Sequence, residues 1–419
     1  MDTGDTAWIL ASSALVLLMT PGLAFFYGGM VRSKSVLNMM MMSFLAMAIV
    51  PILWILYGYS MAFDDDLGGG LLGGFNLVGL TDMNMDTAFG TIPAYVFVAF
   101  QLMFAIITVA LITGAIADRA KFLAWAVFVV VWVTIVYFPV AHWVFAFDGD
   151  DTKGGWIANN LGALDFAGGT AVHINAGAAG LALALVLGKR VGWKRDPMRP
   201  HNLPFVLLGA GLLWFGWYGF NAGSAVGSNG LAGLAFVNTT VATAAAILGW
   251  LFVELIRDKK ATSLGGASGA VAGLVAITPA CGALTPVGSI ALGIIAGILC
   301  ALAVGLKYKF GYDDSLDVVG VHLVGGLVGT LLIGFLASGD VGLFYGGNFD
   351  QLGKQAVAAF AVLAYSFIVT YIIGKLIDVT IGFRITEEDE VLGIDQVEHL
   401  ETAYDEAGTL GGSNLKTGV

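Results

Sequence analysis

Charged side chains are scarce in this chain of 419 residues. Only 12% of the residues are Asp, Glu, Lys or Arg, whereas 58% are apolar. A soluble domain carries about 25% charged residues, so this chain has too few charges to cover a surface that faces water. That scarcity excludes an ordinary cytosolic enzyme and a nucleic-acid-binding protein, and the apolar content excludes a disordered chain. We expect one polytopic domain whose surface mostly faces lipid.

Cysteine is almost absent as well. The two that occur, Cys281 and Cys300, lie in or beside apolar stretches, which is typical of small buried residues and indicates neither a disulfide framework nor a metal site. An intramembrane enzyme, with a metal held by two histidines and two aspartates, is an alternative. Against it, the chain has no H-E-x-x-H motif, and no third ligand lies near either histidine. We therefore expect no enzyme, no metal and no cofactor.

Eleven stretches meet or approach the roughly 20 apolar residues that a helix needs to cross the hydrocarbon core of a bilayer. Glycine and proline interrupt several of them, as is common in membrane helices. We therefore predict an all-α polytopic membrane protein with eleven transmembrane helices, of which the eighth is the shortest. They lie near residues 7–31, 35–62, 92–117, 122–145, 168–188, 203–224, 232–256, 264–281, 287–306, 317–338 and 355–378.

Lysine and arginine test this count independently. With eleven spans and the amino terminus outside, 17 of the 19 Lys and Arg residues fall on the cytoplasmic side, and only Lys153 and Lys354 fall outside. The positive-inside rule thus supports both the span number and the orientation. The amino terminus lacks the basic residues of a signal peptide, so we expect the first helix to remain as a span. We predict a transmembrane domain over 1–382 and a cytoplasmic regulatory tail over 383–419.

Two glycine-rich segments resemble each other. Residues 164–180 read LDFAGGTAVHINAGAAG, and residues 316–329 read LDVVGVHLVGGLVG. Each begins with Leu-Asp and carries a histidine, His173 in the fifth span and His322 in the tenth. Because five spans separate them, the two halves would have opposite orientations, as in transporters built from inverted repeats. We predict such a repeat of helices 1–5 and 6–10, plus one extra helix.

Small residues four apart indicate tight helix packing. G-x-x-x-G lets helix backbones approach closely where no hydrophobic effect drives helices together. Each match alone is weak, because glycine is so common in this chain. The pairs are Gly269 with Gly273, Gly293 with Gly297, and Gly325 with Gly329.

The two histidines lie well inside their spans. An ionisable side chain within a membrane is costly and needs a partner or a cavity. Two separate histidines, each bonded to nearby backbone, would meet that need, but the matching repeat positions favour a facing pair, His173 and His322, that lines one pore. Such a pair can pass a proton or bind a small polar solute. Because two facing cations repel, we expect the pair to be mostly neutral at pH 7.

Two aspartates lie at or just inside the starts of the histidine helices. Asp165 and Asp317 are placed to cap these helices and pair with the helix dipoles. An alternative role for Asp165, on the outer side, is to add a negative potential that attracts a cation. The sequence leaves both readings open.

Aromatic residues gather near the outer ends of several spans. Phe100 and Phe104 share one helix face at i, i+4 spacing, and Trp217 and Phe220 lie in the sixth span with Ser224 one turn further. Most aromatic residues of a membrane protein belong to the interfacial belt or the bundle core. Aromatic faces beside a hydroxyl acceptor are also how a protein selects an ammonium-like cation. These residues are therefore candidates for a cation site.

Several long strings closely resemble those of the Amt/MEP/Rh ammonium transporters, on the Amt side. The resemblance covers nearly the whole chain, including the tail from 383 to 404, and its motifs are long and specific. The strings are TPGLAFFYGGMVRSKSVLN (20–38), FQLMFAIITVALITGAIADR (100–119), AHWVF (141–145), LDFAGGTAVHINAG (164–177), GWYGFNAGSA (216–225) and DVVGVHLVGG (317–326).

The resemblance implies a homotrimer in the cytoplasmic membrane, with one pore per subunit. It implies that His173 and His322 are the twin pore histidines and that Phe104 and Phe220 form a stacked phenylalanine gate. The hydroxyl of Ser224 would accept a hydrogen bond from recruited ammonium, and the carboxylate of Asp165 would support that site from beneath. The predicted recruitment residues are Phe104, Phe145, Trp217, Ser224 and Asp165.

One position departs from the family pattern. A tryptophan usually ends the A-H-x-V-W string in this family and gives the outer site its main cation–π face, whereas this chain has Phe145. Tryptophan is the better cation–π partner, so we expect weaker affinity or selectivity at the outer site. The neighbouring Trp143 is out of register, and we do not expect it to substitute.

The predicted function is ammonium uptake, with methylammonium as a second substrate. Recruited ammonium would lose its proton at the dry gate, because a bare cation is expensive in an apolar pore, and ammonia would then pass the two histidines. The proton follows by a separate route in this reading. In a second reading the protein is a passive ammonia gas channel. In a third it is an ammonium sensor acting through a partner, since too few residues follow Phe383 for a fused kinase or cyclase domain.

The acidic segment 383–406 is the candidate regulatory element. A solvated tail is the simplest interpretation, but five apolar residues indicate that part of it docks. The resemblance implies contacts with cytoplasmic loops and neighbouring subunits, and a PII-type signalling protein as a partner at this face. No nucleic-acid partner is expected. The apolar residues are Val391, Leu392, Ile394, Val397 and Leu400.

Overall fold

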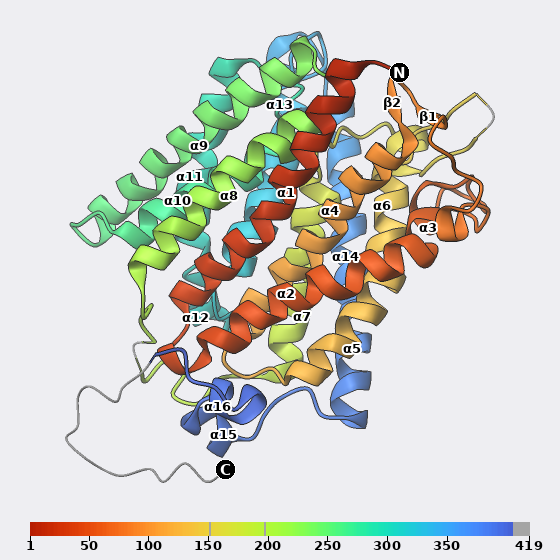
Figure 1. Ribbon diagram of the computed structural model, residues 1–419. Coiled ribbons are helices and arrows are strands. Elements are labelled where there is room, and N and C mark those ends of the chain that lie inside the picture. Colours follow the sequence, from red (N-terminus) through yellow and green to blue (C-terminus); the bar gives the residue numbers. More distant parts are fainter. Residues whose placement is uncertain (151, 197, 405–419) are drawn as a thin grey trace.

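The computed structural model describes residues 1–150, 152–196 and 198–404, which form a bundle of long helices with one short strand pair (Figure 1). The strands β1 (Ala88–Phe89) and β2 (Ile92–Pro93) are antiparallel. The helices are α1 (Thr3–Met30), α2 (Val36–Leu53), α3 (Tyr59–Phe63), α4 (Ala94–Ile112), α5 (Phe122–Trp132), α6 (Phe138–Phe145), α7 (Asn175–Leu187), α8 (Leu203–Gly223), α9 (Gly230–Arg257), α10 (Ser263–Ile277), α11 (Pro286–Ala303), α12 (Leu306–Phe310), α13 (Val324–Leu336), α14 (Asp350–Thr380), α15 (Glu387–Leu392) and α16 (Ile394–His399).

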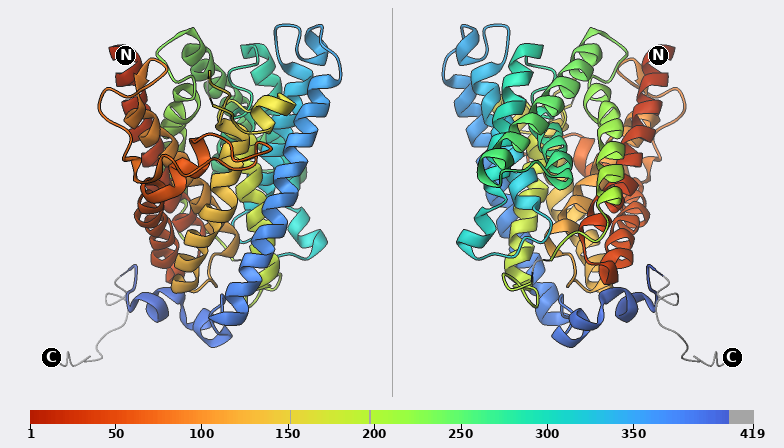
Figure 2. Two further views of the ribbon diagram at one scale, coloured as in Figure 1. Left: turned by 90° about the vertical axis from the view of Figure 1, so that its right-hand side faces the viewer. Right: turned by 90° about the vertical axis from the view of Figure 1, so that its left-hand side faces the viewer.

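The two ends of the bundle differ. The amino terminus and the β1–β2 pair lie at one end, which we call the N-terminal face (Figures 1 and 2). The short helices α15 and α16 lie across the opposite end, which we call the tail face. The long helices run between these two faces, so a path along the bundle axis would join them.

The predicted membrane spans agree closely with the helices. Ten helical stretches of the described residues are long and apolar enough to cross a membrane. The stretch Phe122–Phe145, for example, joins α5 to α6 through a π-helical turn, Val133–Tyr137, and coincides with the predicted fourth span. The predicted eighth span corresponds to α10, which has only 15 residues, fewer than the roughly 20 that a bilayer requires. The count of eleven therefore stays a prediction.

Glycine allows the close approach of several long helices. A Cβ atom on Gly293 or Gly297 of α11 would overlap the carbonyl oxygens of Ala242 and Ala246 in α9. A Cβ atom on Gly329 of α13 would overlap the backbone of α10 in the same way. These glycines belong to the G-x-x-x-G motifs, whose predicted role in close helix contact is confirmed at these positions.

The tail docks on the tail face chiefly through carboxylates. Asp395 of α16 accepts hydrogen bonds from the backbone N–H groups of Leu37 and Asn38 in α2, at 2.9 and 2.8 Å. Glu398 accepts one from the backbone N–H of Phe122 in α5, at 2.9 Å. Neither α2 nor α5 has a side-chain cap of its own at its start. The tail therefore satisfies free N–H groups of two bundle helices and places negative charge at their positive ends.

The prediction that part of the tail docks is confirmed, although most of the apolar side chains that suggested it stay exposed in this single chain. Ile394 is buried, but the side chains of Val391, Leu392 and Leu400 are 59%, 64% and 81% exposed. The reason is that α16 turns its carboxylates toward the starts of α2 and α5, whereas Glu390 of α15 bonds Arg384 and the backbone N–H of Val191. Phe383, which precedes α15, is the buried apolar anchor and packs against the bundle.

Candidate functional site

A cavity of about 360 Å³ opens at the N-terminal face, and we call it the vestibule. Its lining is mostly apolar and rich in aromatic rings, and its polar side chains are Gln101, Asp165 and Ser224. The predicted recruitment residues Phe104 and Phe145 also line it. Seven phenylalanines contribute in all, namely Phe89, Phe97, Phe100, Phe104, Phe145, Phe147 and Phe166.

Two phenylalanines separate the vestibule from a smaller space. Phe104 of α4 and Phe220 of α8 are almost completely buried, and their ring centroids are 4.4 Å apart. The predicted gate residues are therefore in contact. Beyond them lies a space of only about 10 Å³, lined by Phe220 and both histidines, which we call the chamber. Such a volume holds about one molecule of the size of water.

Phe145 faces the vestibule from the last turn of α6. Its ring centroid lies 6.3 Å from that of Phe104. Trp143, two residues earlier, points elsewhere: its indole N–H donates to the carbonyl oxygen of Leu71 at 2.8 Å, and its ring packs against Trp156. Trp143 therefore does not supply the vestibule with the indole ring that Phe145 lacks.

Asp165 lines the vestibule and caps the helical segment that carries His173. Its Oδ1 accepts hydrogen bonds from the backbone N–H groups of Gly168 and Gly169, at 2.8 and 2.7 Å. Its Oδ2 accepts the backbone N–H of Thr170 at 2.7 Å and also the hydroxyl of that residue. Gly168 has a φ of 118°, which favours glycine and turns the chain into the helix. The capping role is thus observed, and the carboxylate also places its charge beside the vestibule.

Ser224 stands one turn beyond Phe220, at the vestibule side of the gate. Its hydroxyl donates a hydrogen bond to the carbonyl oxygen of Phe220 at 2.7 Å. Because the hydroxyl hydrogen is used in this bond, the lone pairs of the oxygen remain to accept hydrogen bonds. Ser224 is therefore equipped to accept a hydrogen bond from a cationic donor in the vestibule.

His173 and His322 face each other in the chamber. Their Nδ1 atoms are 3.3 Å apart, the ring planes differ by 21°, and both side chains are buried. Since one hydrogen lies between two ring nitrogens, one ring donates and the other accepts, so the neutral pair consists of opposite tautomers. The Nε2 atom of His173 has no hydrogen-bond partner among the described residues. That nitrogen is available to a solute in the chamber.

Trp217 lies beside the chamber and does not line the vestibule. Its ring stacks on His173, with centroids 5.4 Å apart, and its indole N–H donates to the hydroxyl of Thr278 at 2.8 Å. We expected Trp217 among the recruitment residues. The structure places it deeper, because it precedes Phe220 by one turn of α8 and Phe220 already forms the gate.

The second histidine helix is capped by Asp314, and the prediction that Asp317 caps it is wrong. Asp314 accepts hydrogen bonds from the backbone N–H groups of Val318 and Val319, at 3.1 and 2.7 Å. Asp317 instead has a φ of 65° and forms an ion pair of 2.7 Å with Lys307. Its carboxylate is thus directed away from the start of the helix.

A spacing in the sequence identifies the correct acid. Asp165 precedes His173 by eight residues, and Asp314 precedes His322 by the same number. Both histidines lie in π-helical segments, which are rare and frequent at functional sites. The Leu-Asp match that pointed to Asp317 is out of register because the second segment is three residues shorter between that dipeptide and its histidine.

A second cavity, also of about 360 Å³, opens at the tail face, and we call it the tail-side cavity. In contrast to the vestibule, it is lined by charged side chains of both signs. The basic ones are Arg32, Arg190, Lys194, Arg199 and Lys307, and the acidic ones are Asp118, Asp196 and Asp317.

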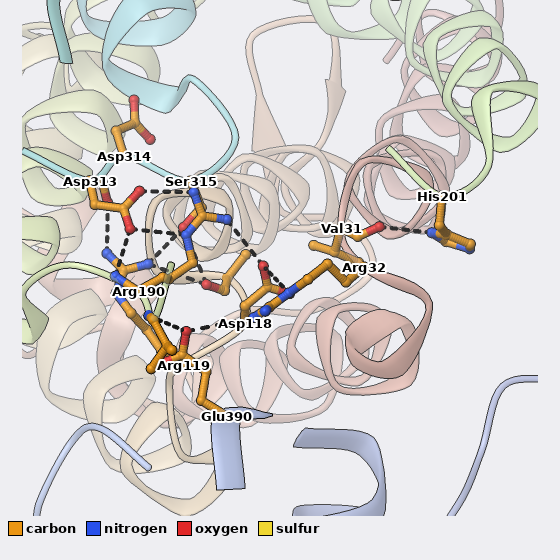
Figure 3. Close-up of polar contacts among 12 residues, drawn as sticks. Val31, Arg32, Asp118, Arg119, Arg190, His201, Asp313, Asp314, Ser315 and Glu390 are labelled. Carbon is orange, nitrogen blue, oxygen red and sulfur yellow. Dashed lines mark hydrogen bonds and ion pairs between the residues drawn. The ribbon is translucent and has the colours of Figure 1, made fainter. Parts of the chain in front are cut away.

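Buried ion pairs form one wall of the tail-side cavity (Figure 3). Arg190 donates to Asp118 at 3.1 Å and to both oxygens of Asp313 at 2.8 and 3.0 Å. Arg119, fully buried, donates to the hydroxyl of Ser315 and the carbonyl oxygen of Asp313. Burial favours the neutral carboxyls, but the neighbouring guanidinium groups outweigh it and hold the pKa of Asp118 and Asp313 below the ordinary value. Burial lowers the pKa of Arg119 to about 10.

Several vestibule residues were not predicted from the sequence. Phe89 comes from β1 and stacks on Phe97 with ring centroids 3.7 Å apart, and Phe147 follows the end of α6. These two lie outside long helices, so no helical periodicity marks them. Gln101 follows Phe100 directly in α4, but a single polar residue in an apolar helix does not by itself indicate that it lines a cavity.

In the part of the chain that the structure describes, the side chains that could bind a metal ion do not form a cluster. No group of three or more His, Cys, Asp or Glu side chains that could hold a metal ion occurs among those residues. Cys281 and Cys300 are buried free thiols, as their apolar surroundings in the sequence indicate.

Comparisons of the sequence point to one family. A family model described as the Ammonium Transporter Family matches residues 7–404. An ammonium transporter of Mycobacterium tuberculosis (strain H37Rv) is 63% identical over 432 residues, which cover 96% of this chain and 91% of that protein. An ammonium transporter of Bacillus subtilis (strain 168) is 49% identical over 416 residues, which cover 97% of this chain and 100% of that protein.

Solved structures share the fold. A structure described as "Sensor Amt Protein" has a TM-score of 0.88 and 30% identity, covering 94% of this chain and 98% of that one. The crystal structure of Candida albicans Mep2 has a TM-score of 0.82 and 36% identity, covering 93% of this chain and 88% of that one. The arrangement of helices is therefore similar over almost the full length of each.

Proposed function

Because this chain belongs to the ammonium transporter family and is a multi-pass protein of the cell membrane, we propose that it takes up ammonium through the vestibule, the gate and the chamber. The observation that carries this path is the contact of His173 with His322 directly behind two phenylalanine rings that touch each other. A buried imidazole pair with a free ring nitrogen suits a small neutral base and offers no charge to balance a cation. Methylammonium, slightly larger, is a second substrate.

The proposed mechanism separates the proton from the nitrogen. Ammonium enters the vestibule, where aromatic faces attract the cation and Ser224 accepts one of its hydrogen bonds. The charge of Asp165 supports the cation from behind its capped helix. At the gate the ion loses its proton, because an unpaired cation is costly in an apolar space. Ammonia then passes His173 and His322, and the proton crosses by a separate route.

The proposal includes a topology. We place the N-terminal face outside and the tail face in the cytoplasm, because 17 of the 19 Lys and Arg residues then lie inside. We count α10 as the eighth of eleven spans. The first five membrane spans and the next five then form an inverted repeat. It is supported by the equal Asp–His spacings and the π-helical segments of its two halves.

The assembly and the tail are parts of the same proposal. We place three subunits in the functional protein, each with its own pore, and residues 383–419 as a regulatory tail after a transmembrane domain of 1–382. The exposed apolar side chains Val391, Leu392 and Leu400 suit a neighbouring subunit or a PII-type signalling protein at the tail face. A pull-down with PII proteins of the same host, repeated under several nucleotide conditions, contradicts the PII part if it is consistently empty.

Reconstitution in liposomes tests the proposed function. An ammonium pulse should evoke a transient current, whereas an equal potassium pulse should not. Internal alkalinisation without a current would replace the mechanism by a neutral gas channel. If the pulse evokes no current and no pH change, the proposed transport is contradicted.

A second candidate function is ammonium sensing through a partner protein. It is favoured by one observation, the similarity of the fold to a structure described as "Sensor Amt Protein". A sensor without transport would bind ammonium in calorimetry yet give no response in the liposome assay.

A further inference from the structure

The vestibule is larger and more apolar than ammonium needs. We propose that it also binds organic cations with a quaternary ammonium group, and that such cations block the ammonium path because they cannot pass the gate. This inference rests on the proposed function, since it treats the vestibule as the entrance to the pore. It assigns a ligand class to the same cavity.

The balance of rings and acceptors in the vestibule carries the argument. Seven phenylalanines line it, whereas the polar side chains are only Gln101, Asp165 and Ser224. An ammonium ion has four N–H groups, and each one that leaves water without an acceptor costs free energy. A quaternary ammonium group has no N–H, so it requires no acceptor, and its methyl groups gain from contact with aromatic faces.

Asp165 strengthens this argument, because its carboxylate is already used. Both oxygens accept hydrogen bonds from the start of the His173 helix, with two donors on Oδ1 and three on Oδ2. Little capacity remains to bind an N–H group of a solute directly. Its negative charge still acts over distance, and a quaternary cation uses that charge as well as ammonium does.

The sizes of the two spaces explain why the bound ion would block the path. The vestibule has about 360 Å³, within the range of small-molecule sites. The chamber has about 10 Å³, and the rings of Phe104 and Phe220 lie 4.4 Å apart in front of it. A trimethylammonium head fits the first space but not the second, and it has no proton to lose at the gate. It should occupy the vestibule and remain there.

Choline provides the test, because it has a neutral analogue of equal shape. In proteoliposomes, choline should raise the ammonium concentration for half-maximal current and leave the maximal current unchanged. The neutral 3,3-dimethylbutan-1-ol, in which carbon replaces nitrogen, should have little effect. Choline alone should evoke no current, and sodium chloride at the same concentration controls for ionic strength.

A matched pair of variants locates the site. Phe147→Leu removes one ring from the vestibule rim and should weaken choline inhibition about two- to fivefold, since an exposed cation–π contact has that strength. Phe310→Leu makes the same change at an exposed position of α12 at the tail face and should leave inhibition unchanged. Choline binding to the purified protein, measured by calorimetry, should show the same difference.

The outcomes separate this inference from the proposed function. Ammonium current without choline inhibition, equal inhibition by the neutral analogue, or a choline current would each overturn the inference and leave ammonium transport standing. If ammonium itself evokes no response, the proposed function fails, and calorimetry then decides the inference. Choline binding that depends on Phe147 supports it, and absence of binding overturns it.

Discussion

The vestibule and the tail-side cavity have the same volume, about 360 Å³, and opposite chemistry. Phenylalanines dominate the first, and its one carboxylate is consumed by a helix cap. Basic and acidic side chains dominate the second, and a buried ion-pair network forms its wall. A cation entering the first meets ring faces, whereas a solute in the second meets charged side chains of both signs.

The difference matches the two halves of the proposed transport. Removing water from ammonium needs aromatic faces that attract the cation, together with acceptors for its N–H groups. Releasing ammonia, and returning a proton to it, needs hydrated polar groups. The two cavities should accordingly respond differently to substitution: changes at the tail face should affect stability, and changes in the vestibule should affect substrate affinity.

The largest effect is expected from Arg190→Met. The substitution leaves Asp118 and Asp313 buried without their main partner, and breaking a buried ion pair costs about 3–5 kcal/mol. The Tm of the purified protein in detergent should fall steeply. Arg195→Met, an exposed neighbour on the same loop, should leave Tm nearly unchanged. Equal Tm values for the two variants would contradict the structural role of the network.

A smaller loss of stability, with a large loss of transport, is expected from Asp165→Asn. An amide has one acceptor oxygen, so its NH₂ group would face backbone donors, at a cost of about 1–3 kcal/mol. The start of the His173 helix should shift, and uptake should fall to a small fraction of wild type. Asp340→Asn, an exposed aspartate with a φ of 63°, is the control. Normal uptake by Asp165→Asn would show that transport does not depend on this helix cap.

The acid limit of stability should also reveal the tail-side network. The pKa of Asp118 and of Asp313 is lowered from 3.8 in the folded protein. Each carboxylate therefore adds stability that is present above that ordinary value and lost as the pH falls through the lower, folded one. The Tm should stay level down to about pH 4 and decline below it. In Arg190→Met this acid step should shrink; an unchanged step would assign it to other groups.

The smallest effect is expected at Phe145→Trp. A larger ring faces the vestibule without entering the gate, and the gain of one better cation–π partner lowers the KM for ammonium about two- to fivefold. The maximal rate and Tm should not change. Trp143→Phe, two residues away but turned toward Leu71, should not affect KM. A lower maximal rate in Phe145→Trp would instead mean that the ring obstructs the gate.

The sequence predicts the helices well, because long apolar runs and the distribution of lysine and arginine report directly on a bilayer. It also pairs His173 with His322, through their matching places in two similar segments. It does not distinguish Trp217 from Phe220, since both lie on one helix face and only the contact with Phe104 of α4 decides which ring closes the gate. Nor does it place Phe89 or Phe147, which reach the vestibule from outside the long helices.

The ion pairs of the tail face show a second limit of the sequence. Counting basic residues indicates the side of the membrane on which Arg190 lies but not its partners, Asp118 and Asp313, which come from distant parts of the chain. The choice of Asp317 as a cap fails for a related reason. A matching dipeptide is a weaker guide than the eight-residue spacing to the histidine, because the cap must face the first turn of the helix.

The central claim is that ammonia crosses the chamber along His173 and His322. Its most direct test compares ammonium and potassium responses of His173→Ala in proteoliposomes with those of wild type and of His201→Ala. His201 bonds Val31 and Tyr404 at the tail face and lies outside the chamber. The account predicts that only His173→Ala loses ammonium uptake or its discrimination against potassium. Wild-type uptake and discrimination in His173→Ala would contradict it.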